Sequence, residues 1–82
     1  MKPGDILYYT DKGAKFYFDV ELVEIIRNEE YNTDLYKCKI LYNKYKFNNP
    51  DYKPNFDLKG KVEVFSILSF SKTLEEAEQK IA

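Results

Sequence analysis

Apolar and polar residues alternate with a period of two along much of this 82-residue chain. Because successive side chains of a β-strand point to opposite faces of a sheet, this period predicts strands that bury one face. The longest such run begins at residue 16, and its apolar face consists of Phe16, Phe18, Val20 and Leu22. The alternation therefore predicts a mainly β fold.

The phase of this alternation changes after Leu22, where Val23 and Ile25 become the apolar residues, with Glu24 between them. One inserted residue, as in a β-bulge, would cause such a slip and would bend the strand. A strand buried on both faces at this point is the alternative. We favour the bulge because small β-barrels need bends of this kind.

Shorter strands are expected besides this one, at residues 5–10, 36–42, 62–64 and 67–70. In the strand that begins at residue 62, Val62 and Val64 are predicted to face the core, with Glu63 outward. Together with the long run, these segments predict five short strands.

Residues 43–57 show no regular period and contain Pro50 and Pro54. A connection of this length is long for a small domain, and such loops are often functional. We therefore expect a long loop at 43–57.

A short helix is expected at the C-terminus, over residues 73–81. Thr73 can cap its first turn, and Glu76 stands three residues later, as in a capping box. A helix this short does not persist alone in water, so its apolar side must dock. We expect it to close one open end of a barrel; docking on a second copy, which would make a homodimer, is the alternative. Its apolar stripe consists of Leu74, Ala77 and Ile81.

The composition excludes several classes of protein. A single cysteine, Cys38, excludes a disulfide scaffold and a multi-cysteine zinc site. The chain has no histidine, so the commonest general base and metal ligand are missing. Of the neighbouring carboxylates, Glu29-Glu30 lies in an expected turn, and Glu75-Glu76 lies in the first turn of a helix, where adjacent side chains do not converge on one point. We therefore expect no enzyme, no metal and no cofactor.

The length predicts a single domain, residues 1–82, in which we expect a β-barrel over residues 3–70. No apolar stretch approaches a membrane span, and residues 1–5 lack the apolar region of a signal peptide. A lone free cysteine fits a reducing compartment. We therefore expect a cytoplasmic protein without a membrane partner.

Two stretches, Gly4 to Tyr9 (GDILYY) and Val20 to Ile25 (VELVEI), resemble the first two strands of SH3-like small barrels, Tudor-type domains above all. The resemblance covers residues 3–70 and is architectural. It implies a five-stranded antiparallel barrel, followed here by the short helix. It also implies the binding of peptides, modified side chains or nucleic acid rather than catalysis.

The net charge is −1, but residues 37–61 carry seven lysines against Asp51 and Asp57. Aromatic residues are interleaved with these lysines. Bases stack on aromatic rings while lysines meet phosphates, so the segment 36–61 is a candidate nucleic-acid site. A protein-binding surface, or a loop whose rings tuck back onto the sheet, are the alternatives. The candidate residues are Tyr42, Lys44, Tyr45, Lys46, Phe47, Tyr52, Lys53 and Phe56.

A second candidate is acidic: Asp19, Glu21 and Glu24 are predicted on the outer face of the second strand. Opposite Lys37 and Lys39 on the next strand, they can form cross-strand ion pairs. As a free patch they would attract a basic protein, and tyrosine-rich surfaces suit such contacts.

These observations give two hypotheses from different classes. The first is a non-catalytic domain that acts by binding another protein, a second copy of itself included. One form of it is a phage or mobile-element inhibitor of a host nucleic-acid-handling or defence protein, which rests on the lysine-, asparagine- and isoleucine-rich composition. The second is an RNA- or single-stranded-DNA-binding module that uses residues 36–61.

Overall fold

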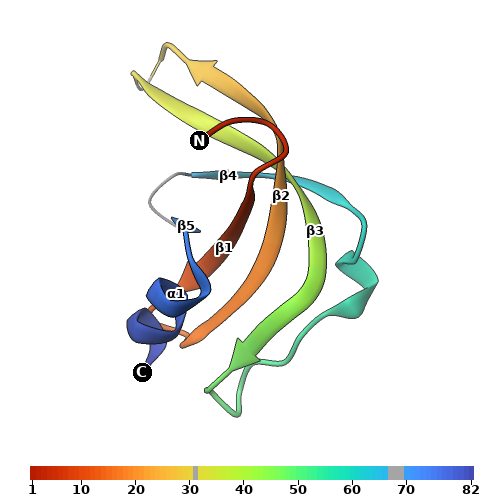
Figure 1. The fold of residues 1–82 in the computed structure, drawn as a ribbon, viewed down its shortest axis with the longest axis vertical. Coiled ribbons are helices and arrows are strands. Elements are labelled where there is room, and N and C mark those ends of the chain that lie inside the picture. The colour runs from red at the N-terminus through yellow and green to blue at the C-terminus, as the bar shows by residue number, and fades with distance from the viewer. Residues whose placement is uncertain (31, 67–69) are drawn as a thin grey trace.

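The computed structural model describes residues 1–30, 32–66 and 70–82. The described residues form one antiparallel sheet in the order β4-β3-β2-β1-β5 and one short C-terminal helix (Figure 1). The predicted mainly β fold is therefore confirmed. The sheet is not closed, because β4 and β5 form its two edges. Its elements are β1 (Ile6–Asp11), β2 (Phe16–Asn28), β3 (Thr33–Phe47), the 3₁₀-helix η1 (Phe56–Leu58), β4 (Val62–Ser66), β5 (Phe70–Ser71) and α1 (Leu74–Ile81).

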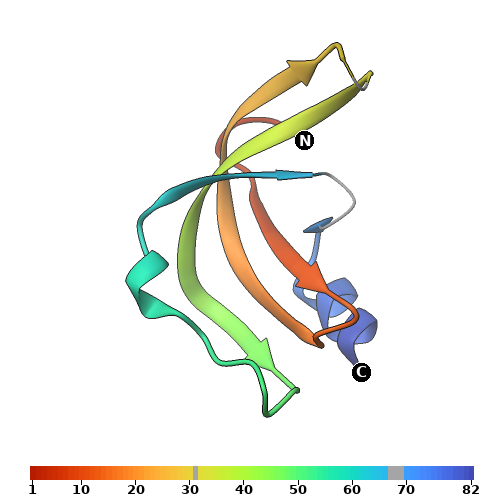
Figure 2. The ribbon, with the colours of Figure 1, turned by 180° about the vertical axis from the view of Figure 1, so that it is seen from behind.

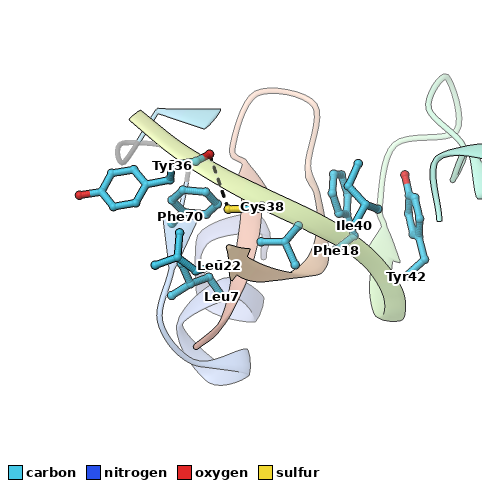
Figure 3. Close-up of a cluster of buried hydrophobic side chains, with 9 residues drawn as sticks. Leu7, Phe18, Leu22, Tyr36, Cys38, Ile40, Tyr42 and Phe70 are labelled. Atoms are coloured by element: carbon cyan, nitrogen blue, oxygen red, sulfur yellow. Dashed lines mark hydrogen bonds between the residues drawn. The ribbon is translucent and has the colours of Figure 1, made fainter. Parts of the chain in front are cut away.

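The two faces of the sheet bury different sets of side chains. One face, which we call the core face, carries the main apolar cluster (Figure 3). The predicted alternation of β2 is confirmed here, since Phe18, Val20 and Leu22 all belong to this cluster. Of the predicted fifth strand, residues 67–69 lie outside the described residues. The buried members of the cluster are Leu7, Phe18, Val20, Leu22, Tyr36, Cys38, Ile40, Tyr42 and Phe70.

The opposite face, which we call the helix face, is covered in part by α1. Ala77 and Ile81 are buried against Tyr8 and Tyr17, whose rings meet edge-on with centroids 6.2 Å apart. The expectation that this helix closes an open end of a barrel is therefore wrong. Tyr8 of β1 and Tyr17 of β2 form a second apolar site on the helix face, and the apolar residues of α1 pack on that site.

The start of α1 follows the sequence prediction. Thr73 is the N-cap, and its hydroxyl accepts a hydrogen bond from the Glu76 N–H at 3.1 Å. The Glu76 carboxylate in turn accepts from the Lys72 N–H at 3.3 Å. These bonds satisfy backbone donors that a helix N-terminus otherwise leaves without partners.

A β-bulge at Val23 is also confirmed. Leu22 pairs with Cys38, whereas Glu24 pairs with Lys37, so two residues of β2 advance while β3 advances by one. The extra residue reverses which side chains face the core, and Val23 is 42% exposed. This explains the phase change in the sequence.

The expected loop at 43–57 is partly wrong, because β3 continues to Phe47. A second irregularity hides this continuation. Phe18 pairs with Tyr45 and Val20 with Ile40, so Asp19 of β2 lies opposite a four-residue excursion of β3, residues 41–44. The irregular connection therefore begins at residue 48, and it includes η1.

The prediction that Val62 and Val64 face the core is wrong. They pair with Lys39 and Lys37, and directly paired residues share a face, so both valines lie on the exposed helix face. Their side chains are 44% and 52% exposed. Phe65, the largest apolar residue of β4, takes the core face instead and packs on the main cluster.

Candidate functional site: an exposed aromatic surface

Five aromatic side chains form a continuous series at one end of the core face. The ring of Phe56 contacts Tyr45 at a centroid distance of 5.3 Å, and Tyr45 lies 6.4 Å from Phe47. Phe47 stacks on Phe16 at 4.9 Å and 10°, and Phe16 lies 6.0 Å from Tyr52. We call these five residues the aromatic surface. Tyr45, Tyr52 and Phe56 are 43%, 49% and 52% exposed.

Tyr42 packs beneath the aromatic surface. It is buried, and its ring lies 4.8 Å from Phe18 in the core and 5.5 Å from Phe56 at the surface. Burial raises the pKa of the Tyr42 hydroxyl above its usual value. Through Tyr42, which Figure 3 shows beside Phe18, the exposed rings are thus continuous with the apolar core of the domain.

The backbone conformation of β3 at residues 41–44 determines on which face of the sheet the following aromatic residues lie. Tyr42 has φ +51°, a left-handed conformation that non-glycine residues rarely adopt. The Asp19 carboxylate stabilises the excursion, because its Oδ1 accepts hydrogen bonds from the N–H groups of Asn43 and Lys44 at 2.8 and 3.0 Å. After this excursion Tyr45 pairs with Phe18 and so faces the core side.

The connection after β3 is fixed at three points. At its start, the Asn48 N–H donates to the Lys15 carbonyl at 2.8 Å, and in its middle the Asn55 N–H donates to the Tyr42 hydroxyl at 3.4 Å. At its end, the Gly60 N–H donates to the Ile40 carbonyl at 2.7 Å. In Figures 1 and 2 this segment lies beside β3, on the far side of the molecule from α1.

The lysines of the candidate segment do not join the aromatic rings. Lys44 and Lys46 alternate with Tyr45 and Phe47 in β3, so they point to the helix face. Lys46 pairs there with Glu78 of α1 at 3.0 Å. Lys53 is exposed in the connection between β3 and η1. Within β3, the interleaved residues therefore separate into an aromatic face and a basic face.

The acidic candidates also separate. Asp19 is only 3% exposed and binds the backbone of β3, so its predicted place on an outer acidic patch is wrong. Glu21 lies opposite Lys39 and Glu24 opposite Lys37 in the strand register, but the predicted ion pairs are not formed, since neither pair comes within salt-bridge distance. Each acid thus has a basic residue directly opposite on the helix face, which balances the charge locally.

Two further titratable groups are buried by the sheet. Burial raises the pKa of the Cys38 thiol to about 11, and its Sγ–H points to the Tyr36 carbonyl at 3.7 Å. Burial, with a 2.6 Å hydrogen bond to Glu78, raises the pKa of the Tyr17 hydroxyl to about 12. Both groups are therefore protonated at neutral pH. Among the described residues, no three potential metal ligands come together.

Sequence reasoning missed Phe16 as a surface residue, because its place in the alternation of β2 suggested the core. It is the first residue of β2, where the sheet no longer covers it, and it is half-buried between Phe47 and Tyr52.

In the described part of the chain, no helix is long and apolar enough to cross a membrane. Comparisons with protein-family models, curated proteins and solved structures found no match to this chain.

Proposed function

We propose that this chain is a non-catalytic domain that binds another protein, and that the aromatic surface is its binding site. The observation that carries this proposal is the exposure of Tyr45, Tyr52 and Phe56 in one contiguous series over a buried tyrosine. Large rings that are fixed in place lose little conformational entropy on binding, and tyrosine is enriched among residues that dominate interfaces.

The chemistry of the surface favours an extended peptide segment with apolar side chains. No lysine of β3 points to this face, so the ligand needs no dense negative charge. Covering the exposed parts of the three rings would remove roughly 250 Å² of mostly apolar area from water. That burial contributes about 6 kcal/mol before the entropic costs of association.

The geometry weakens the nucleic-acid hypothesis. A single strand that stacks its bases on the aromatic surface would find Lys44 and Lys46 on the opposite face of β3. Lys46 is also paired with Glu78, while Lys37 and Lys39 lie opposite carboxylates. The β3 lysines therefore do not support phosphate contacts beside the aromatic surface.

The finer description of the fold is part of the proposal. An SH3-like small barrel is supported by the strand order, in which β5 returns to pair with β1 after the run from β1 to β4. A cytoplasmic phage or mobile-element inhibitor is one form such a binding domain takes. Finding the gene among ordinary housekeeping genes would count against that form.

The binding proposal can be tested with peptides selected from a random displayed library on the wild-type domain. Tyr45→Ala is expected to weaken the selected peptides by about tenfold or more, as for a residue that dominates an interface. Val23→Ala is the matched control, because Val23 is 42% exposed and lies outside the aromatic surface. Equal affinities of the two variants, or a failure to select any peptide, would contradict the proposed function.

A further inference from the structure

A different part of the molecule, the free edge of β4, has the geometry of a strand-pairing site. Gly60 has φ +83° and its N–H donates to the Ile40 carbonyl, while the Ile40 N–H donates to Lys61. Gly60 and Lys61 thus both lie opposite Ile40 in a G1 bulge. This bulge determines which residues of β4 form hydrogen bonds with β3. Antiparallel ladders bond at every second residue, so Glu63 and Phe65 bond to β3.

The same pattern leaves Val62, Val64 and Ser66 with their N–H and C=O groups directed away from β3. β4 is an edge of the sheet, and in the described residues it pairs with β3 alone. The strand has no lysine or proline, the residues that usually protect such an edge. Its two valines are exposed and β-branched, which suits strand pairing.

We propose that β4 pairs with β4 of a second copy of this chain in an antiparallel register centred on Val64. In that register Val64 meets Val64 of the second copy, and Val62 meets Ser66, so all three outward residues can exchange hydrogen bonds. A register centred on Glu63 would pair only Val62 with Val64 and would place two Glu63 carboxylates directly opposite each other. The register centred on Val64 is therefore the one in which all three outward residues of β4 find a partner.

Symmetry favours a second copy as the occupant, and the lysines beside Val64 do not oppose it. Beside each Val64 lies Lys37, and in the paired sheet the two Lys37 side chains are separated by three strand spacings, about 14 Å. This exceeds the screening length of about 8 Å at physiological salt, so their repulsion is small. The pairing is isologous and occupies both β4 edges, so it closes at a dimer.

Disulfide trapping tests this register directly. In Val64→Cys, the two new cysteines lie about 5.5 Å apart between Cα atoms, which a disulfide can bridge. In the matched control Val62→Cys, they lie four residues apart along the paired strands, roughly 14 Å, which no disulfide can bridge. The native Cys38 is fully buried and does not interfere.

We expect mild oxidation to convert Val64→Cys to a covalent dimer about tenfold faster than Val62→Cys. Equal rates, or no dimer from either variant, would overturn the register. Sedimentation equilibrium adds a test without a new thiol: the wild type should approach twice its 9.8 kDa mass as concentration rises.

Val64→Pro should remain a monomer in the same experiment, because proline removes the outward N–H but no bond to β3. Val64→Thr, which keeps that N–H and a β-branched side chain, should dimerise like the wild type. A wild type that stays monomeric at every concentration would refute the proposal and would leave the edge to a strand of another protein.

Discussion

Asp19 provides the most informative single substitution, because its carboxylate stabilises the excursion of β3 beneath the aromatic surface. Asp19→Ala removes the acceptor of the Asn43 and Lys44 N–H groups, which lie at 2.8 and 3.0 Å in a partly buried site. A hydrogen bond to a charged group contributes about 1.5–3 kcal/mol, and an amide left without a partner costs about 1–3 kcal/mol. Because water can reach part of this site, we expect the free energy of unfolding to fall by about 2–4 kcal/mol.

That loss is a large fraction of the roughly 4–12 kcal/mol expected for a domain of this length. It corresponds to a decrease of roughly 10–25 °C in the melting temperature. Asp19→Asn keeps an oxygen acceptor without its charge, so its loss should be about 1 kcal/mol. Both values can be measured by urea unfolding followed by circular dichroism.

The matched control is Glu24→Ala, which removes an exposed carboxylate of the same strand. It should change stability by no more than about 0.5 kcal/mol. If Asp19→Ala is as stable as Glu24→Ala, the carboxylate does not stabilise the excursion and the reasoning fails.

Four further outcomes are expected. The hydrogen bond from Tyr17 and then the bond from Lys46 lower the pKa of Glu78, so its contribution to stability is full above the unfolded value near 4.3 and is lost as the pH falls through the folded value. The difference in melting temperature between wild type and Glu78→Gln should therefore shrink as the pH falls below about 4.3. A difference that stays constant with pH would contradict this. The buried Cys38 thiol, with its pKa near 11, should react with a thiol reagent at pH 8 only after denaturation, so fast labelling of the native domain would contradict its burial. Gly60→Ala should destabilise by about 1–2 kcal/mol through its positive φ alone, since no atom lies within 4 Å of the added carbon, and Gly13→Ala is the control without a positive φ. Lys44→Glu combined with Lys46→Glu should leave the affinity of the domain for its peptide unchanged. If the wild type shows any salt-dependent binding of labelled single-stranded RNA, this double variant should bind the RNA equally well.

The sequence predicted those features that depend on local patterns. The β2 alternation, the bulge at Val23 and the cap at Thr73 each follow from a few neighbouring residues, and the structure confirms all three. The face of the sheet on which α1 docks could not be predicted. The apolar residues of α1 require an apolar surface to pack on, but they do not specify which face of the sheet provides it. The partner proved to be Tyr8 and Tyr17, which in the sequence resemble ordinary strand residues.

Two errors arose from pairing register. The continuation of β3 to Phe47 was hidden because the excursion at residues 41–44 interrupts the alternation, and its stabilising partner Asp19 is distant in the sequence. In β4, the valines and Phe65 occupy opposite faces, so only one set can face the core. The bulge at Gly60 and the larger area of Phe65 decide that choice, and neither is visible in the alternation.

The same register decides the candidate site. In the sequence, Lys44 to Phe47 appeared as one basic and aromatic segment, whereas in the sheet a period of two divides it between the faces. The aromatic half joins Phe16, Tyr52 and Phe56 from other segments. The contiguity of these rings depends on tertiary contacts that no local pattern specifies.

The most direct test of the account is a map of the bound peptide on the domain by two-dimensional NMR. The isotope-labelled wild type would be titrated with a peptide selected on it, and the perturbed backbone amides would be assigned. The account predicts that the largest shifts lie at Tyr45, Phe47, Tyr52 and Phe56, with Lys37 and Lys39 unaffected. Shifts confined to the lysine-bearing helix face, with the aromatic surface unchanged, would contradict it.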